Sequence, residues 1–223
     1  MGRKEGPNRG KGAIFDLDGT LLDSMGVWQE VDRIFFDRRG IPMPADFAHE
    51  VAAMQFGDIA DYTIRRFRLH EDKRDVMEEW DRTARRLYAT QVRTKPHAVE
   101  YIHYLRDSGA SLAVATSLSP GLRQAALEHA GLLDCFDLTC SVDDAGQGGK
   151  ESPAIFLHAA QGLGLDPGDC TVFEDILIAI RSARSLGMQV WAMYDPSSDR
   201  DWELIQREAD GCMDDFDQAP RRL

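Results

Sequence analysis

Two kinds of hydrophobic spacing divide the chain. A short apolar run at residues 13–15 follows a polar stretch and stops at Asp16, which predicts a buried strand that ends in an acidic loop. Residues 25–91 instead space their apolar side chains three and four apart, as at Val27 and Val31, which is typical of helices with one buried face. Glycine and proline punctuate that segment, so we expect about four helices in it.

After this segment, helices and apolar strands alternate. The expected strands lie at 111–115, around Leu138, at 171–173 and at 188–193, and the expected helices lie at 97–107, 120–130, 153–162, 176–186 and from Ser198 onward. Such alternation produces a parallel sheet. We therefore predict an α/β fold, a Rossmann-like doubly wound parallel sheet built from residues 1–23 and 93–223. Residues 24–92 would form a small inserted helical domain, and residues 1–12 a disordered tail.

The composition is that of a globular protein with a strong negative charge. Of the 223 residues, 43% are hydrophobic and 29% are charged, and 26 Lys and Arg against 38 Asp and Glu give a net charge of −12. A field of this sign repels nucleic acid, so a phosphate-bearing ligand would need local cations or a metal. No uncharged run is long enough to cross a bilayer, and the four cysteines form no CxxC pair. We expect a cytoplasmic protein with no nucleic-acid or membrane partner.

Asp16 and Asp18 share one turn directly after the first strand. Turn chemistry alone can explain such a pair, because aspartate is common in tight turns. An EF-hand calcium loop cannot, because it needs Gly at its sixth position and Glu at its twelfth, where this chain has Leu21 and Val27. Two carboxylates after a buried strand can also divide catalytic work, one as ionised nucleophile or metal ligand and the other as protonated general acid.

Polar residues also follow two other expected strands. Thr116 and Ser117 can bind an anion through their hydroxyl and backbone N–H groups, or can simply cap the next helix. The adjacent acids Glu174 and Asp175 suit a hard cation such as Mg²⁺, or can interact with the positive end of a helix. Because parallel sheets bind ligands at the carboxyl ends of their strands, we expect these residues to meet in one crevice.

Lys150 stands at the end of a glycine-rich run, residues 146–149, and before an expected helix. The run is not a Walker A phosphate loop, because such a loop needs Ser or Thr after the lysine and this chain has Glu151. Lys150 can therefore point towards an anion in the crevice or lie in solvent.

Taken in order, these segments resemble the four motifs of a known family. Residues 16–24 (Asp-Leu-Asp-Gly-Thr-Leu-Leu-Asp-Ser), 115–117, 149–150 and 173–175 resemble those of the haloacid dehalogenase-like hydrolase superfamily. The resemblance is strongest to its phosphatases and β-phosphoglucomutase-like members, which carry a helical cap after the first motif. It covers nearly the whole chain from residue 13 onward, and the first motif is highly specific.

The resemblance implies a covalent, two-step reaction. Asp16 would attack the phosphorus and become an aspartyl-phosphate, while Asp18 would protonate the leaving oxygen and later activate water. Thr116 would hydrogen-bond to the transferred phosphoryl group, with Ser117 beside it. Lys150 would bind the same group and neutralise charge between it and the nucleophile.

The resemblance also implies Mg²⁺ as the cofactor. Its ligands would be the Asp16 carboxylate, the Asp18 backbone carbonyl and Asp175. Glu174 would be a further ligand or an acceptor just outside the ligand set.

Several other activities in the family fit the chain less well. A dehalogenase has no alkoxide to protonate and so no need for Asp18, and the phosphonate-cleaving branch replaces that acid. A sugar phosphomutase of the β-phosphoglucomutase type carries a His twelve residues after the nucleophile, where this chain has Trp28. A non-catalytic phospholigand-binding module would have no use for a nucleophile paired with an acid. We expect a phosphatase, with the mutase and the binding module as alternatives.

Departures from the family pattern concern the substrate. Glu151 follows the lysine where proline is frequent, and Ile176 and Ala179 stand where Ser and Gly are frequent after the acidic pair. These differences weaken any substrate assignment by analogy. We expect a monomer that acts on a small phosphorylated metabolite, with substrate choice residing in the helical insert, where the candidates are Trp28, Gln55, Phe56, Tyr62, Arg65 and Arg66.

Overall fold

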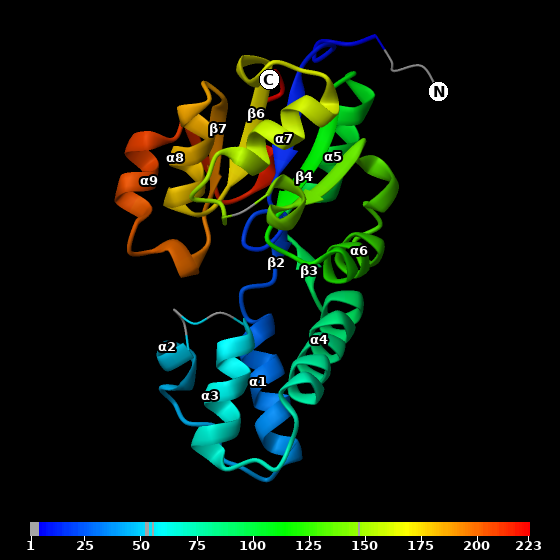
Figure 1. Ribbon diagram of the computed structural model, residues 1–223. Coiled ribbons are helices and arrows are strands. Elements are labelled where there is room, and N and C mark those ends of the chain that lie inside the picture. Colours follow the sequence, from blue (N-terminus) through cyan, green and yellow to red (C-terminus); the bar gives the residue numbers. More distant parts are fainter. Residues whose placement is uncertain (1–4, 52–53, 55, 147) are drawn as a thin grey trace. The chain divides into compact units, whose positions relative to one another are not determined.

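The chain folds into two compact units. The computed structural model describes residues 5–51, 54, 56–146 and 148–223. One unit contains residues 1–25 and 92–223, and the other contains residues 26–91. The first carries a sheet with helices on both faces, and the described elements of the second are helices (Figure 1).

The sheet of the first unit has six parallel strands in the order β5-β4-β1-β6-β7-β8. Their bounds are β1 Gly12–Phe15, β4 Ser111–Thr116, β5 Leu138–Ser141, β6 Cys170–Glu174, β7 Gln189–Met193 and β8 Gly211–Met213. The chain starts at the centre, builds outwards to β5 and then returns to build outwards to β8. The predicted Rossmann-like, doubly wound α/β fold is therefore confirmed.

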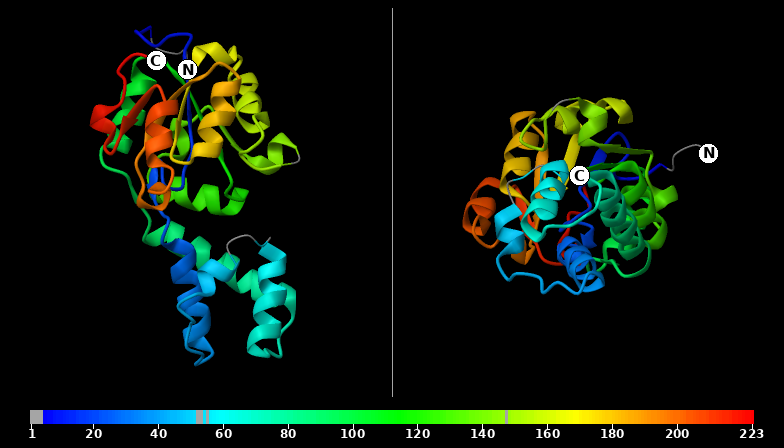
Figure 2. Two further views of the ribbon diagram at one scale, coloured as in Figure 1. Left: turned by 90° about the vertical axis from the view of Figure 1, so that its left-hand side faces the viewer. Right: turned by 60° about the horizontal axis from the view of Figure 1, so that its bottom comes forward.

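Successive side chains of a strand point to opposite faces of the sheet, so each face has its own hydrophobic core. Ile14 and Val172 pack in one cluster with the helices α7, α8 and α9, whose bounds are Ala154–Leu163, Leu177–Ser185 and Trp202–Glu208. Their neighbours Phe15 and Phe173 point the other way and stack with ring centroids 4.4 Å apart. Tyr101 of α5 (Ala98–Asp107) packs edge-on against both of these rings. Figure 2 shows these helices on the two faces of the sheet.

The second unit is held together by aromatic side chains. Its helices are α1 Val27–Arg38, α2 Phe47–Val51, α3 Phe56–Phe67 and α4 Lys73–Thr90. Phe36 of α1 contacts Phe47 and Phe67 with ring centroids 5.0 and 4.8 Å apart, and Phe35 contacts Trp80 of α4 at 5.3 Å. Helical spacing explains these aromatic residues as core, because they lie on the buried faces of their helices.

Asp32, also on α1, is partly buried, and the loss of water around its carboxyl group raises its pKa to about 7. The folded-state pKa thus lies above that of the unfolded chain, so the free energy of unfolding falls as the pH rises from about 4 to about 7. We expect Asp32→Asn to raise the free energy of unfolding by about 2 kcal/mol at pH 8, a value reduced for the residual exposure of the side chain. At pH 3.5 the variant and the wild type should be equally stable. Urea unfolding at the two pH values checks this, and an equal effect at both would contradict it.

The expected disordered tail is wrong for residues 5–12. Asn8 is fully buried: its side chain donates to the Ser108 hydroxyl (2.9 Å) and to the Arg221 carbonyl (3.0 Å), and accepts from the Leu223 N–H (3.0 Å). Gly12 already belongs to β1. A single buried amide with three partners orders this segment, which composition alone does not reveal. Residues 1–4 lie outside the described residues.

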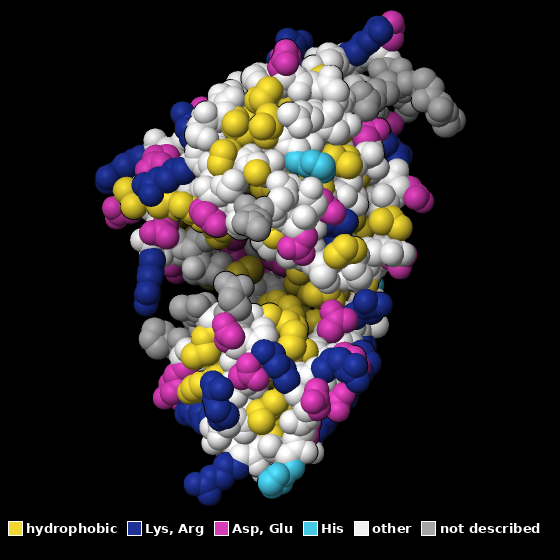
Figure 3. Space-filling view, viewed as in Figure 1, with side chains coloured by type: hydrophobic (Ala, Val, Ile, Leu, Met, Phe, Trp, Pro, Cys, Tyr) yellow, Lys and Arg dark blue, Asp and Glu magenta, His cyan; other side chains and the backbone are white. Residues whose placement is uncertain are grey.

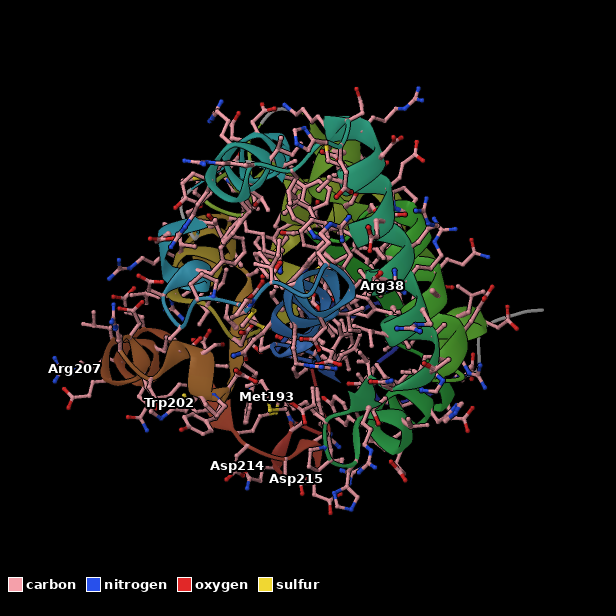
Figure 4. All side chains as sticks on the ribbon, turned by 90° about the horizontal axis from the view of Figure 1, so that it is seen from below. Arg38, Met193, Trp202, Arg207, Asp214 and Asp215 are labelled. Atoms are coloured by element: carbon pink, nitrogen blue, oxygen red, sulfur yellow. The ribbon has the colours of Figure 1, made fainter. Side chains whose placement is uncertain are left out.

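The boundaries of the other elements follow the predicted pattern, with three differences. The last helix begins at Trp202, after a separate 3₁₀ turn at Pro196–Ser198. The sequence prediction also missed β8, a short outer strand (Figure 4, where Met193, Trp202 and Asp214 mark this edge of the sheet). Two very short strands, β2 Leu22–Asp23 and β3 Arg93–Thr94, pair antiparallel where the chain leaves and re-enters the first unit.

The remaining connections of the first unit are short. They contain α6 Pro120–His129 and the 3₁₀ turns Leu133–Cys135, Val142–Ala145, Pro167–Asp169 and Phe216–Gln218. Among the helices of the described residues, none is both long and apolar enough to span a membrane.

Candidate active site

Three neighbouring strands deliver the candidate site residues to one edge of the sheet. The central strand β1 lies between β4 and β6, and Phe15 is in register with Val114 and Phe173. The next residue, Asp16, continues the ladder by donating its N–H to the Phe173 carbonyl at 3.0 Å. Asp16 thus lies beside the carboxyl ends of both neighbouring strands, where Thr116 ends β4 and Glu174 ends β6. The crevice expected from the strand pattern is present.

Lys150 reaches into this edge and pairs with two acids. Its Nζ lies 2.5 Å from Asp16 Oδ1 and also forms an ion pair with Glu174. All three side chains are buried. Burial alone would lower the pKa of Lys150, but the two carboxylates outweigh it and raise that pKa, so the ammonium stays charged. Lys150 is therefore neither a solvent lysine nor part of a phosphate loop.

Glu174 is saturated with hydrogen bonds from its own loop. One carboxylate oxygen accepts from Lys150, and the other accepts the N–H groups of Asp175 (2.8 Å) and Ile176 (3.1 Å). Glu174 is fully buried. It therefore fixes the position of Lys150 and the path of the chain through Asp175, which places it behind the site.

Asp175 has one carboxylate oxygen paired and one bare. Oδ1 accepts from the Thr20 hydroxyl at 3.1 Å, while Oδ2 is buried with no hydrogen-bond partner among the described residues. Burial and the nearby carboxylates of Glu174 and Asp16 raise the pKa of Asp175 well above its usual value. A buried, unpaired carboxylate oxygen is costly unless a cation or proton satisfies it.

The donor set suits a small divalent cation. Oxygen atoms of Asp16, Glu174 and Asp175 lie within 4.8 Å of one another, and all three residues are buried. Burial raises the pKa of Asp16 to about 7, because the desolvation and the neighbouring acids outweigh the pairing with Lys150. A bound divalent cation would favour the ionised forms of these groups. Hard carboxylate oxygens are the ligands that Mg²⁺ takes in proteins, so the residues present fit the cofactor.

Gly19 makes room for the bare oxygen of Asp175. Its φ is +78°, and a Cβ atom at this position would lie 2.4 Å from Asp175 Oδ2. Gly10 has nearly the same φ, +80°, with no atom within 4 Å of a Cβ. Any side chain at residue 19 would push the carboxylate away from the donor set.

We expect Gly19→Ala to lower the free energy of unfolding by about 2 kcal/mol more than Gly10→Ala does. Both variants strain the left-handed backbone, so the difference isolates the clash with Asp175. Gly19→Ala should also weaken Mg²⁺ binding, measured by titration calorimetry, while Gly10→Ala should not. Equal effects of the two substitutions would show that the Asp175 carboxylate can move without cost.

The second acid of the pair, Asp18, is positioned by a residue that the sequence prediction did not single out. The Ser24 hydroxyl, which is buried, donates to Asp18 Oδ1 at 2.5 Å. On the neighbouring strand, the Thr116 hydroxyl accepts the Leu118 N–H at 3.2 Å, which shapes the loop after β4. Ser24 was already visible in the first motif, but only the folded turn shows which side chain it contacts.

A pocket of about 150 Å³ opens above these groups. Its walls are Asp16, Asp18, Met25, Thr116, Ser117, Lys150, Asp175 and Ile176. Six of the seven residues proposed from the sequence thus line one cavity, and the seventh, Glu174, lies behind Lys150. Met25 and Ile176 were not expected there, because nothing in the sequence indicates which loop side chains turn towards the cavity.

The candidate specificity residues of the helical unit have varied partners. Tyr62 donates its hydroxyl to Glu50 at 2.9 Å, and Arg66 pairs with both of these residues. Trp28 and Phe56 are partly exposed and contact each other with ring centroids 5.7 Å apart. Arg65 is exposed, and Gln55 lies outside the described residues.

Comparisons with known proteins show which family this chain resembles in sequence. A profile of haloacid dehalogenase-like hydrolases matches residues 11–187. Hexitol phosphatase A of Escherichia coli (strain K12) is 30% identical over 192 residues, which cover 85% of this chain and 85% of that protein. Fructose-1-phosphate phosphatase YqaB of the same organism is 29% identical over 179 residues, 79% of this chain and 93% of that protein.

The fold is also found among solved structures. CbbY from Rhodobacter sphaeroides, in a complex with xylulose-(1,5)bisphosphate, superposes with a TM-score of 0.75 at 19% identity and covers 93% of this chain and 95% of that chain. The matched profile spans more than half of the chain and includes all the strand ends that form the pocket, from β1 to β6. The protein therefore belongs to the haloacid dehalogenase-like hydrolase family.

Proposed function

We propose that this protein is a Mg²⁺-dependent phosphatase that hydrolyses a small phosphate monoester through an aspartyl-phosphate on Asp16. One observation carries the proposal: Lys150 Nζ lies 2.5 Å from Asp16 Oδ1, inside a pocket that also contains Asp18 and the buried acid cluster. A nucleophile, an acid and a fixed positive charge in one small cavity are what phosphoryl transfer requires.

In the first step, an Asp16 carboxylate oxygen attacks the phosphorus and the ester P–O bond breaks. Asp18 gives its proton to the departing alcohol oxygen, and the Ser24 hydroxyl holds the Asp18 carboxyl in place. Lys150 and the hydroxyl groups of Thr116 and Ser117 bind the phosphoryl oxygens, where negative charge is concentrated. The products are a free alcohol and the aspartyl-phosphate.

In the second step, Asp18 is a carboxylate and accepts a proton from water. The resulting hydroxide attacks the phosphorus and the bond to Asp16 breaks, which releases inorganic phosphate and restores the nucleophile. Mg²⁺, held by Asp16, Asp175 and the Asp18 carbonyl, would neutralise charge on the phosphoryl group. The same two acids thus serve both steps.

The size of the pocket and the charge of the protein support a small substrate. The pocket of about 150 Å³ has room for a phosphoryl group. Acidic and basic side chains are mixed over the face drawn in Figure 3, and the net charge is −12. Since such a field repels polyanions, the attraction for phosphate must come from Lys150 and the cation. The named substrates of the relatives, hexitol phosphate and fructose 1-phosphate, are small phosphate esters.

Release of phosphate from p-nitrophenyl phosphate tests the proposal. We expect release with Mg²⁺ and none after treatment with EDTA, and trapping with beryllium fluoride should place the fluoride complex on Asp16. Substrate phosphate consumed without release of inorganic phosphate, with an isomeric sugar phosphate as product, would instead support a mutase. Saturable phosphate binding with no turnover of any ester would support a non-catalytic binding module.

A further inference from the structure

Two apolar side chains, those of Met25 and Ile176, line a pocket whose other lining residues are polar. We call these two side chains the apolar rim. Of the eight lining residues, only Met25 and Ile176 lack a polar side-chain group. Met25 is 45% exposed, so its side chain is accessible to a ligand in the pocket. The phosphoryl group must bind among the charged side chains, so these two residues face the part of the substrate that leaves.

Both residues are held next to the catalytic groups. Ile176 directly follows Asp175, and its N–H is fixed by Glu174 at 3.1 Å. Met25 directly follows Ser24, whose hydroxyl binds Asp18. The rim therefore cannot move far without disturbing the acid that protonates the leaving alcohol. Under the proposed function, its apolar surface would lie next to the first carbons of that alcohol.

An apolar rim can discriminate between substrates with and without a hydroxyl group at this place. A hydroxyl group that is pressed against Ile176 or Met25 loses hydrogen bonds to water and gains none from these side chains. A C–H group at the same place loses nothing and buries apolar surface. A Ser side chain at the position of Ile176 would instead offer a substrate hydroxyl group a hydrogen-bond partner.

We propose that this pocket selects phosphate monoesters in which the carbon next to the phosphorylated carbon bears hydrogen and no hydroxyl group. Ile176 and Met25 are the specificity-determining residues for this choice. The inference rests on the proposed phosphatase function and narrows its substrate class to deoxygenated or alkyl-like phosphates. It concerns only the part of the substrate within reach of this pocket.

Two three-carbon esters that differ by one hydroxyl group test this proposal. The ratio of kcat/KM for n-propyl phosphate to that for the 1-phosphate of 1,2-propanediol is measured for the wild type and for Ile176→Ser. We expect a wild-type ratio of about ten, because an unpaired hydroxyl of this kind costs roughly one factor of ten, and we expect the ratio to fall to near one in Ile176→Ser. Comparing the ratios of two proteins cancels the difference in leaving-group chemistry.

The matched control is Ile178→Ser. Ile178 lies two residues after Ile176, in the first turn of α8. It is 47% exposed and does not line the pocket, so its substitution should leave the ratio unchanged. If Ile176→Ser proves unstable, Ile176→Thr adds the hydroxyl in a side chain of nearly the same shape. Met25→Gln should also lower the ratio, because it places a polar group at the other apolar position of the pocket lining.

The possible outcomes distinguish failure of this inference from failure of the proposed phosphatase function. Active protein whose ratio is the same in Ile176→Ser as in the wild type would overturn the inference and leave the phosphatase standing. A protein that releases no phosphate even from p-nitrophenyl phosphate would contradict both the inference and the proposed phosphatase function. A ratio lowered equally by Ile178→Ser would show a general effect of helix polarity and would also overturn the inference.

Discussion

Asp16→Asn should abolish Mg²⁺-dependent phosphate release, with kcat lowered by at least about 10⁴-fold, as is found when a covalent nucleophile is removed. The amide has nearly the same shape as the carboxylate but cannot attack the phosphorus. Phosphate release from p-nitrophenyl phosphate at saturating substrate measures the loss. Asp23→Asn is the control, because this exposed aspartate belongs to the same motif and is absent from the pocket lining.

The fold of Asp16→Asn should remain intact. Burial raises the pKa of Asp16 to about 7, so ionisation of this group disfavours the folded state above the pKa of the unfolded chain. Replacing the carboxyl group with an uncharged amide removes that cost. Urea unfolding in Mg²⁺-free buffer at pH 8 should therefore show no loss of stability. An inactive protein that is also unfolded would leave the role of the nucleophile undecided, whereas a folded protein with full activity would refute it.

Lys150→Met should have the largest effect on stability. The ammonium group pairs with Asp16 and Glu174 inside the protein, so its removal leaves two buried carboxylates without a cation. Breaking a buried ion pair from one side costs about 3–5 kcal/mol. We expect that loss in the free energy of unfolding at pH 8 without Mg²⁺. Phosphate release with Mg²⁺ should also fall at least a thousandfold, by about 4 kcal/mol of transition-state stabilisation.

The loss of unfolding free energy in Lys150→Met should depend on pH. Burial raises the pKa of Asp16 in the folded state, so this carboxylate takes up a proton as the pH falls and part of the uncompensated charge disappears. The destabilisation by Lys150→Met should therefore be smaller at pH 5 than at pH 8. Adding Glu174→Gln to the variant should recover part of the loss at pH 8.

A surface ion pair is the matched control for this variant. Lys11 pairs with Asp169 at 2.9 Å, and both side chains are more than one third exposed. Exposed pairs of this kind contribute about 0–1 kcal/mol, so Lys11→Met should change the free energy of unfolding only slightly and at neither pH preferentially. Equal losses for the two lysine variants would contradict the buried arrangement around Lys150.

The strand ends were the most predictable part of the molecule. Because side chains alternate along a strand and parallel strands end at one edge, the segments before Asp16, Thr116 and Asp175 were enough to predict the sheet and the crevice. Local patterns carry that information. The resemblance added the roles, which stay proposals, and the profile match confirmed the family.

Contacts between distant residues could not be predicted from local patterns. Asn8 is ordered by residues about a hundred and two hundred positions away, and Glu174 turns back to Lys150 and its own loop. Loop conformation alone decides that Met25 and Ile176 line the pocket. Each of these features depends on tertiary packing, which overrides the preferences of short segments.

The buried acid cluster has a consequence for the sequence of events at this site. Asp16, Glu174 and Asp175 lie close to the ammonium group of Lys150, so negative charge is in excess whenever all three carboxyl groups are ionised. A dianionic ester would be repelled from that cavity, whereas a divalent cation would be attracted to it. Under the proposed function, binding is therefore ordered: the metal ion enters first and the ester second, and phosphate departs before the metal does.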